Sequence, residues 1–250
     1  MAKSIILIPS RMAATRLPNK PLLKINNKSM IMHVYDKALE SNIGDVFVAT
    51  SDQIIFDEVK SNGGKSIITS DRHNTGTDRI AEALSKIDTS DIDYVINLQG
   101  DEPLIDINDI KNLNYQAITQ NSDLATLACK IDDQKKYNNP NIVKVMTKDD
   151  LSSNDISRAI KFERKSEYNN KNYTYHHIGI YIFKTSILKK FVEFPQSLNE
   201  KNYKLEQLRA LDNGINIDVI LAKSSPVGID TEEDYLCLLY TSPSPRDAHK

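Results

Sequence analysis

The sequence predicts an α/β fold in which helices flank a mixed, mainly parallel sheet. The first observation is an uninterrupted apolar run at residues 5–8, which is typical of a strand buried on both faces of a parallel sheet. The second is the alternation of short strands with helical patterns through the first half, which indicates right-handed βαβ units. The third is that polar loops follow the strands, where ligands bind in open α/β sheets.

In the first half, the elements follow one another closely. After the first strand and its loop, Ser29 can cap a helix whose apolar side chains share one face and which ends near Gly44. The remaining patterns predict strands at 46–49, 66–69 and 94–98, and helices at 52–60 and 75–87.

After about Asn121 the pattern changes, and the sheet is expected to become mixed. Strands are predicted at 124–131, 142–147, 177–183 and 217–222, and helices at 203–213 and 232–239. The charged, weakly periodic segment 149–175 is expected to form a lid or a dimerisation excursion, within a region of about 124–183. We expect residues 1–239 to form a single domain and the atypical tail at 240–250, which has two prolines, to be disordered.

The composition excludes several classes of protein. The chain has 250 residues, with 32 Lys and Arg against 34 Asp and Glu, so there is no general basic field to attract nucleic acid. The N-terminal apolar run stops at Pro9, which is too short for a signal peptide or a membrane span. Cys129 and Cys237 show no metal or disulfide spacing. A cytoplasmic protein that does not bind membranes is therefore expected.

The loop after the first strand is a candidate anion site. It carries Arg11, Arg16 and Lys20, with small residues between the two arginines, and Pro18 and Pro21 restrict the backbone around the lysine. A polyphosphate suits this loop, because its oxygens accept hydrogen bonds from backbone amides and cationic side chains. A solvated basic loop is the alternative, but the position at the carboxyl end of a strand favours a ligand site.

Two aspartates follow later strands. Asp101 comes after Gly100, directly behind the strand at 94–98, and Asp230 follows a second glycine in a similar position. Mg²⁺ is usually held by one or two carboxylates together with substrate phosphates, so the pair predicts a magnesium site. A turn aspartate and a helix cap are the alternatives.

Two further segments carry polar groups. Residues 73–79, His-Asn-Thr-Gly-Thr-Asp-Arg, place hydroxyl groups at a helix start, which suits a base or sugar, although capping by Thr75 or Thr77 explains them equally well. His176 and His177 precede or begin a strand, so their rings point in opposite directions and at most one is functional.

These motifs occur in order over nearly the whole chain, together with three others. They are the loop at 11–21, His-Asn-Thr-Gly-Thr-Asp-Arg at 73–79, Gln-Gly-Asp-Glu-Pro at 99–103, His-Ile-Gly-Ile-Tyr at 177–181, Leu-Glu-Gln-Leu-Arg at 205–209 and Gly-Ile-Asp-Thr at 228–231. In combination they closely resemble the cytidylyltransferases that act on 3-deoxy-manno-octulosonate (Kdo). The motifs at 177–181 and 205–209 differ from those of the cytidylyltransferases that act on sialic acids.

The resemblance implies a nucleotide-diphospho-sugar transferase fold, which is Rossmann-like. It also implies a Mg²⁺-dependent reaction of CTP with Kdo that releases pyrophosphate, catalysed by a cytoplasmic homodimer that supplies lipopolysaccharide synthesis. In-line attack by the anomeric hydroxyl on the α-phosphorus would need mainly positioning and charge neutralisation. No general base is obvious, and a metal ion that lowers the pKa of the hydroxyl would make one unnecessary.

Carried over by position, the resemblance also implies roles for single residues. Phosphate contacts fall to Arg11, Arg16 and Lys20, and Thr77 and Gln99 should lie beside the cytidine. Asp101 and Asp230 should bind Mg²⁺. The sugar acid should meet Arg158 through its carboxylate, and its hydroxyls should meet His177, Tyr181, Glu206 and Gln207. The sequence departs from the family pattern at 160–164 and after Leu236.

Three alternatives remain. The acceptor could be a related acid, such as an 8-amino Kdo analogue or a sialic acid. A metal-dependent glycosyltransferase is less favoured, because the Asp-Ile-Asp at 91–93 precedes its strand instead of following it. A non-catalytic nucleotide-binding module would not need two aspartates at strand ends.

Overall fold

The structure is a computed structural model that describes residues 2–13, 17–164, 173–223, 228–229 and 231–241. Its contacts divide the chain into two compact units. Unit 1 comprises residues 1–5, 90–97 and 108–225, and unit 2 comprises residues 6–89, 98–107 and 226–250. A single domain over residues 1–239 stays a prediction.

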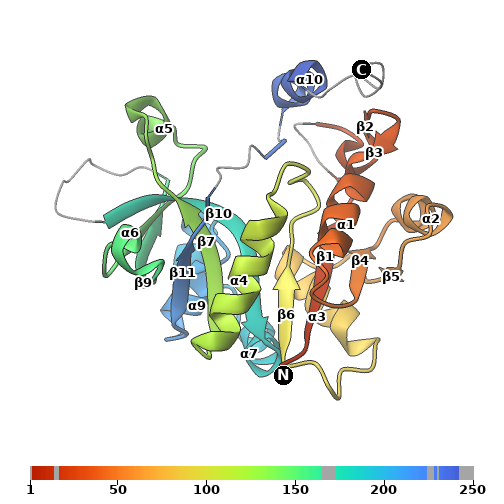
Figure 1. The fold of residues 1–250 in the computed structure, drawn as a ribbon. Helices are drawn as coiled ribbons and strands as arrows, with labels where there is room; N and C mark the ends of the chain where they lie inside the picture. Colours follow the sequence, from red (N-terminus) through yellow and green to blue (C-terminus); the bar gives the residue numbers. More distant parts are fainter. Residues whose placement is uncertain (1, 14–16, 165–172, 224–227, 230, 242–250) are drawn as a thin grey trace. The chain divides into compact units, whose positions relative to one another are not determined.

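Unit 2 is built on three parallel strands in the order β5-β4-β1. They are β1 (Ser4–Ser10), β4 (Val46–Thr50) and β5 (Ser66–Ile68). Every residue of β1 is buried, which confirms the interpretation of its unbroken apolar run as a strand covered on both faces. The helices α1 (Met30–Glu40), α2 (Gln53–Ser61) and α3 (Gly76–Ser85) alternate with these strands as predicted (Figure 1).

Two short elements of unit 2 were not predicted. A 3-10 turn, η1 (Lys20–Leu22), follows the basic loop, and a small hairpin joins β2 (Lys24–Ile25) to β3 (Lys28–Ser29). The hairpin turns at Asn26 and Asn27, whose φ angles are 49° and 67°. Asparagine tolerates this left-handed conformation better than most residues, so the pair of asparagines is the sequence signal for the turn.

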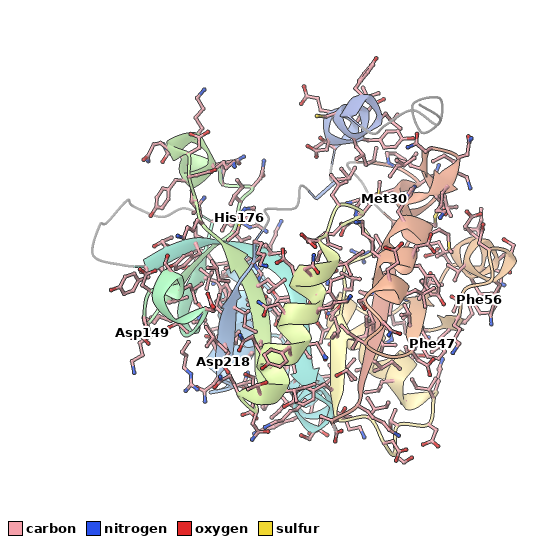
Figure 2. All side chains as sticks on the ribbon, viewed as in Figure 1. Met30, Phe47, Phe56, Asp149, His176 and Asp218 are labelled. Carbon is pink, nitrogen blue, oxygen red and sulfur yellow. The ribbon has the colours of Figure 1, made fainter. Side chains whose placement is uncertain are left out.

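A small apolar cluster fixes this region of unit 2. Leu17, Ile25, Met30, Ile229 and Leu238 are all buried against one another, and Met30 is labelled in Figure 2. The last of them lies on α10 (Glu232–Thr241), which confirms the predicted terminal helix. Residues 242–250 of the expected disordered tail lie outside the described residues.

Unit 1 contains the mixed part of the sheet. Its strands are β6 (Tyr94–Asn97), β7 (Leu124–Cys129), β8 (Lys144–Thr147), β9 (Ile156–Glu163), β10 (Tyr173–Lys184) and β11 (Ile217–Leu221), in the order β6-β10-β7-β11-β9-β8. The pairing of β11 with β7 is parallel, whereas β10 runs antiparallel to β6, β7 and β8. Because β10 also pairs with β8, the strands from β10 to β8 close into a ring, and the predicted change to a mixed sheet is confirmed.

Six helices accompany these strands in the described part of unit 1. They are α4 (Ile107–Thr119), α5 (Gln134–Asn138), α6 (Leu151–Asn154), α7 (Thr185–Glu193), α8 (Leu198–Tyr203) and α9 (Leu208–Asp212). Figure 1 shows α4 on the near side of the strands. The polar residues of α4 obscured its helical period, although Ile110, Leu113 and Ala117 form its buried face.

One sequence-based interpretation needs correction. The single helix predicted at 203–213 is wrong, because α8 ends at Lys204, whose φ of 54° is left-handed, and α9 begins four residues later. The segment 149–175 contains α6 and the eight-residue strand β9, and its role as a lid or a dimerisation excursion stays a prediction. Within the described residues, no helix is both long enough and apolar enough to span a membrane.

Candidate active site

Unit 2 contains a pocket of about 370 Å³ at the carboxyl end of β1. Three segments line it, and they are drawn from residues 9–21, 73–79 and 99–101. They are the three motifs that the sequence marked as ligand-binding loops in this half of the chain. The loop after the first strand therefore lies with the segment that follows the strand predicted at 94–98.

Lys20 and Asp101 meet in this pocket. The Nζ atom of Lys20 donates a hydrogen bond of 2.7 Å to Oδ2 of Asp101. The lysine side chain is only 9% exposed, whereas the aspartate side chain is 41% exposed. The backbone delivers Lys20 here because Asn19 adopts a left-handed φ of 57° and Pro21 follows at the start of η1.

Gly100 allows the loop before Asp101 to lie against β1. A Cβ atom at this position would lie 3.1 Å from the carbonyl oxygen of Pro9 and 3.2 Å from Cδ1 of Ile31. Both contacts are tighter than ordinary van der Waals packing. The glycine is thus required by close backbone approach.

Arg11 is exposed and lines the pocket. The next residue, Met12, is held because its backbone N–H donates to Oδ2 of Asp52 at 3.0 Å. The backbone N–H of Asp52 in turn donates to Oγ1 of Thr50 at 3.1 Å. The start of the basic loop is therefore tied to the end of β4, whereas Arg16 lies outside the described residues.

The first turn of α3 forms another wall. Thr75 caps the helix, since its side chain accepts a hydrogen bond from the backbone N–H of Asp78 at 3.2 Å. Gln99 lines the pocket as expected, but Thr77 is buried and is not among the lining residues. Arg79 does line it, although the sequence assigned this residue no role.

Arg79 is a buried cation at the pocket wall. Its Nη1 atom donates to Oγ1 of Thr69 at 2.6 Å and to the carbonyl oxygen of Ser70 at 3.1 Å. Burial lowers the pKa of this guanidinium, but an arginine stays charged at neutral pH. In the sequence, only the position of Arg79 in the segment 73–79, next to a helix start, indicated that it could lie at the pocket.

A second charged group, Glu82, supports the same wall. Its carboxylate accepts from the backbone N–H of Ser70 at 2.9 Å and pairs with Lys86 at 2.7 Å and with His73. Burial would raise the pKa of Glu82, but these hydrogen bonds outweigh it and lower the pKa to about 2. This fixed negative charge holds His73 at the pocket.

In unit 1, the structure brings together two of the predicted sugar-acid residues. His177 and Tyr181 lie on β10 with ring centroids 5.5 Å apart, and Phe162 packs edge-on against the histidine at 5.0 Å. Burial, with a smaller contribution from His176, lowers the pKa of His177 to about 3, so the ring is neutral. His176 is less buried, in keeping with the expected alternation along the strand (Figure 2).

Arg158 lies elsewhere in unit 1. It pairs with Asp218 in the sheet register, and its Nε atom is 3.8 Å from Oδ1 of that aspartate, which Figure 2 labels on β11. Asp218 is opposite Ala125 on β7, whereas Tyr181 is opposite Thr126. Because neighbouring positions in a strand face opposite sides, Arg158 and Tyr181 point to different faces of the sheet.

Glu206 and Gln207 lie in the turn between α8 and α9. Gln207 is buried, and its Nε2 atom has no hydrogen-bond partner among the residues that the structure describes. An unsatisfied buried donor is unfavourable, so a ligand oxygen would stabilise this group. The turn is held by a buried ion pair in which Arg209 donates to both carboxylate oxygens of Glu200, at 2.8 Å and 2.7 Å.

Asp101 is the one predicted metal ligand that can be placed, because Asp230 lies outside the described residues. In the described parts of the chain, no three His, Cys, Asp or Glu side chains gather in a way that could hold a metal. Mg²⁺ does not require a site made of protein ligands alone, however, because one or two carboxylates together with substrate phosphates are enough to bind it.

The chain is similar to known cytidylyltransferases. Residues 5–217 match the cytidylyltransferase family. The 3-deoxy-manno-octulosonate cytidylyltransferase of Brucella anthropi is 42% identical over 233 residues, which cover 93% of each chain. That of Brucella canis is also 42% identical over 233 residues, covering 93% of this chain and 92% of the other.

Solved structures share the fold. A CMP:2-keto-3-deoxy-manno-octonic acid synthetase complexed with CTP has a TM-score of 0.85 and 34% identity, covering 96% of this chain and 98% of the other. The 4-diphosphocytidyl-2C-methyl-D-erythritol synthase of Anaerococcus prevotii, at 13% identity and a TM-score of 0.63 over 96% and 97%, shows the fold alone. The predicted α/β transferase fold is confirmed, and the chain belongs to the 3-deoxy-manno-octulosonate cytidylyltransferase family.

Proposed function

We propose that this protein transfers the cytidylyl group of CTP to Kdo and releases pyrophosphate. The anomeric hydroxyl oxygen of Kdo forms a bond to the α-phosphorus, and the bond from that phosphorus to the bridging oxygen breaks. The electron pair leaves with pyrophosphate, and the hydroxyl proton passes to solvent. The observation that carries this proposal is the pocket of unit 2, whose described lining combines Arg11, Lys20 and Arg79 with the carboxylate of Asp101 and so suits a nucleoside triphosphate.

The chain's own groups supply charge to the triphosphate. Arg11 is exposed at the pocket, while Lys20 is nearly buried and cannot move far from it. Arg79 adds a third positive charge to the wall. Positive groups fixed before the reaction stabilise the charge that develops on the leaving pyrophosphate, without reorganisation at the time of reaction.

Magnesium fits this pocket through Asp101. The carboxylate is part-exposed and lines the pocket, and its present partner, Lys20, can transfer its hydrogen bond to a phosphate oxygen. When bound, Mg²⁺ would neutralise phosphate charge and lower the pKa of the attacking hydroxyl. We propose Asp101 and Asp230 as the ligands, Arg16 as a further phosphate contact, and Thr77 and Gln99 as neighbours of the cytidine.

For the acceptor, we propose that unit 1 recognises the hydroxyls of Kdo through His177, Tyr181, Glu206 and Gln207. The buried Nε2 donor of Gln207 and the neutral ring of His177 support these roles, because both can bind uncharged hydroxyls. Arg158 was expected to bind the carboxylate, but it faces the other side of the sheet from Tyr181 and lies 3.8 Å from Asp218, so the geometry gives this assignment no support.

The experiment is to measure pyrophosphate release from CTP and Mg²⁺ with Kdo, with a sialic acid or without an acceptor. Release that requires Kdo and falls at least 100-fold in Asp101→Asn is expected. Asp106→Asn, a change of the same kind outside the lining residues, is the matched control. Release with another acid alone would replace the acceptor, and CTP binding without any release would overturn the proposal.

We further propose that the enzyme acts as a cytoplasmic homodimer that supplies lipopolysaccharide synthesis. Ile160 on β9 and Tyr173 on β10 are large apolar side chains that are 61% and 46% exposed, which favours a protein partner for these strands. Light scattering after gel filtration should give twice the 28.3 kDa mass of the chain. Ile160→Lys should shift this equilibrium towards the monomer.

A further inference from the structure

We propose that Thr126 is a positioning residue that holds His177 in its Nε2–H tautomer, so that Nδ1 accepts a hydrogen bond from a hydroxyl of the sugar acid. This inference rests on the proposed function, in which His177 binds the acceptor. It adds a residue on β7 that the sequence motifs did not include, and it fixes the direction of one hydrogen bond.

The hydroxyl group of Thr126 lies within hydrogen-bond distance of three polar groups. The Oγ1 atom of Thr126 lies 2.7 Å from the carbonyl oxygen of Ile180, 3.1 Å from that of Ile178 and 3.0 Å from Nε2 of His177. A threonine hydroxyl has one hydrogen and two lone pairs, and a carbonyl oxygen only accepts. The single hydrogen must therefore serve at least one of the two carbonyl oxygens.

The tautomer of His177 follows from this count. If the hydroxyl hydrogen pointed to Nε2, the lone pairs of Oγ1 would face two carbonyl oxygens at 2.7 Å and 3.1 Å. Such close contacts between hydrogen-bond acceptors are repulsive. With the hydrogen on the Ile180 side, Nε2 must carry a proton and donate it to Oγ1. The other ring nitrogen, Nδ1, is then an acceptor.

An irregularity of β10 creates the three-way contact. Ile178 is opposite Leu127, but Tyr181 is already opposite Thr126, so β10 has two extra residues at this point. Such a bulge interrupts the backbone ladder and re-aims the groups within it. Here the carbonyl oxygens of Ile178 and Ile180 both lie within hydrogen-bond distance of the side chain of Thr126.

The surroundings of the ring keep it neutral, which the tautomer requires. Phe162 and Tyr181 pack against His177, which is only 7% exposed. Thr126 is the only hydrogen-bond partner of the ring among the described residues. A neutral ring donates through one nitrogen and accepts through the other, so the hydroxyl of Thr126 decides which kind of group a ligand must offer to Nδ1.

Nitrogen NMR of the full-length protein tests the tautomer without substrate. Protein labelled with ¹⁵N-histidine, in which His177→Asn assigns the signal among five histidines, should show a protonated Nε2 and a bare Nδ1. A protonated Nδ1 in the unliganded protein would overturn the inference. Because this measurement needs neither CTP nor Kdo, its result is independent of the proposed reaction.

Kinetics of matched variants test the consequence for the acceptor. Thr126→Val keeps the shape but removes the hydroxyl, and should raise KM for Kdo roughly tenfold while KM for CTP stays within about twofold. Thr126→Ser keeps the hydroxyl, so this variant should show the wild-type tautomer and the wild-type KM for Kdo. Thr147→Val, a buried threonine of β8 that bonds the carbonyl oxygen of Asp149, is the control and should change neither.

The outcomes separate the two levels of inference. An unchanged KM for Kdo in Thr126→Val, with wild-type activity present, would overturn the role of Thr126 but leave the reaction intact. Absence of any Kdo-dependent turnover in the wild type would overturn the proposed function, while the tautomer would still be read from NMR. If Thr126→Val fails to fold, the wild-type NMR spectrum and Thr126→Ser carry the test.

Discussion

Lys20 and Asp101 form a 2.7 Å ion pair in which the lysine is almost buried and the aspartate is part-exposed. The pair comes from two loops that are 81 residues apart in the sequence. The pair places one positive and one negative charge at the wall of the pocket. The carboxylate of Asp101 therefore offsets part of the positive charge of the lysine and the arginines. A ligand that brings both phosphate and a cation can engage both partners.

The first prediction concerns the buried lysine. Lys20→Met keeps the length of the side chain but removes its charge, and kcat/KM should fall about 10²–10³-fold, as for other losses of a preorganised electrostatic group. Lys24→Met, which removes an exposed lysine that pairs with Glu58, is the matched control and should remain within about twofold. Initial rates of pyrophosphate release measure both. Equal effects of the two changes would contradict a special role for Lys20.

A second prediction concerns Gly100. Gly100→Ala places a Cβ 3.1 Å from the backbone oxygen of Pro9, which cannot move without disturbing β1. The free energy of unfolding should fall by about 1–3 kcal/mol, as for other overpacked sites. Gly228→Ala, where no atom lies within 4 Å of the added Cβ, is the control. Chemical denaturation with both variants gives the comparison, and unchanged stability in Gly100→Ala would refute the close approach.

The third prediction concerns the buried pair of Glu200 and Arg209. The guanidinium donates two hydrogen bonds and stacks 4.6 Å from the centroid of Phe191, and Glu200 also completes the capping box of α8. Arg209→Met leaves a buried carboxylate without its partner and should cost about 3–5 kcal/mol of the free energy of unfolding. The lost restraint on Gln207 should also raise KM for Kdo.

A double variant separates charge from packing at this pair. Glu200→Gln combined with Arg209→Met removes both charges. The double variant should lose less free energy of unfolding than the sum of the losses in the two single variants, by at least about 1 kcal/mol. Lys201→Met, on the exposed face of the same helix, should leave stability unchanged. Additive losses in the double variant would mean that the two side chains stabilise the turn independently.

The fourth prediction concerns acid stability. The unfolded chain protonates His177 near pH 6.5, but burial lowers the pKa in the folded protein to about 3, so the unfolded state binds more protons between these values. The stabilisation of the fold by this neutral ring is complete above pH 6.5, and it is lost as the pH falls towards 3. The loss should approach about 1.4 kcal/mol per pH unit.

The window from pH 6 to 5 separates this effect from that of Glu82, and a variant at position 177 separates it from that of His176, whose pKa is also lowered by burial. Glu82, whose pKa is lowered from 4.5 to about 2, contributes a similar acid loss only below pH 4.5. Urea denaturation at pH 6 and pH 5 should therefore show a smaller change in the free energy of unfolding for His177→Gln than for the wild type. The same pH dependence in both proteins would contradict a buried neutral histidine.

Sequence reasoning was strongest where one physical pattern dominated. The apolar run of β1 and the loops behind the strands located the pocket of unit 2, because burial and strand direction leave few alternatives. The segment at 73–79 was placed at a helix start correctly, but its period could not tell that Thr77 faces inward and that Arg79 lines the pocket. Orientation within one helical turn depends on packing partners.

Unit 1 was harder to predict from the sequence. Thr126 lies in a continuously buried strand, where its hydroxyl looks like an ordinary core residue, and the bulge opposite it has no turn residues apart from a glycine. The helices α8 and α9 looked like one helix because Lys204 is a good helix former in most contexts, whereas here it adopts a left-handed conformation. Register and tertiary contacts decided both features.

The division of the chain into two compact units has a consequence for engineering. The residues that line the nucleotide pocket all belong to unit 2, whereas those proposed for the sugar acid that can be placed belong to unit 1. A mutant library confined to residues 108–223 would therefore vary the choice of acceptor while the side chains around CTP keep their identity. Selection for new activated sugars on this scaffold can begin from such a library.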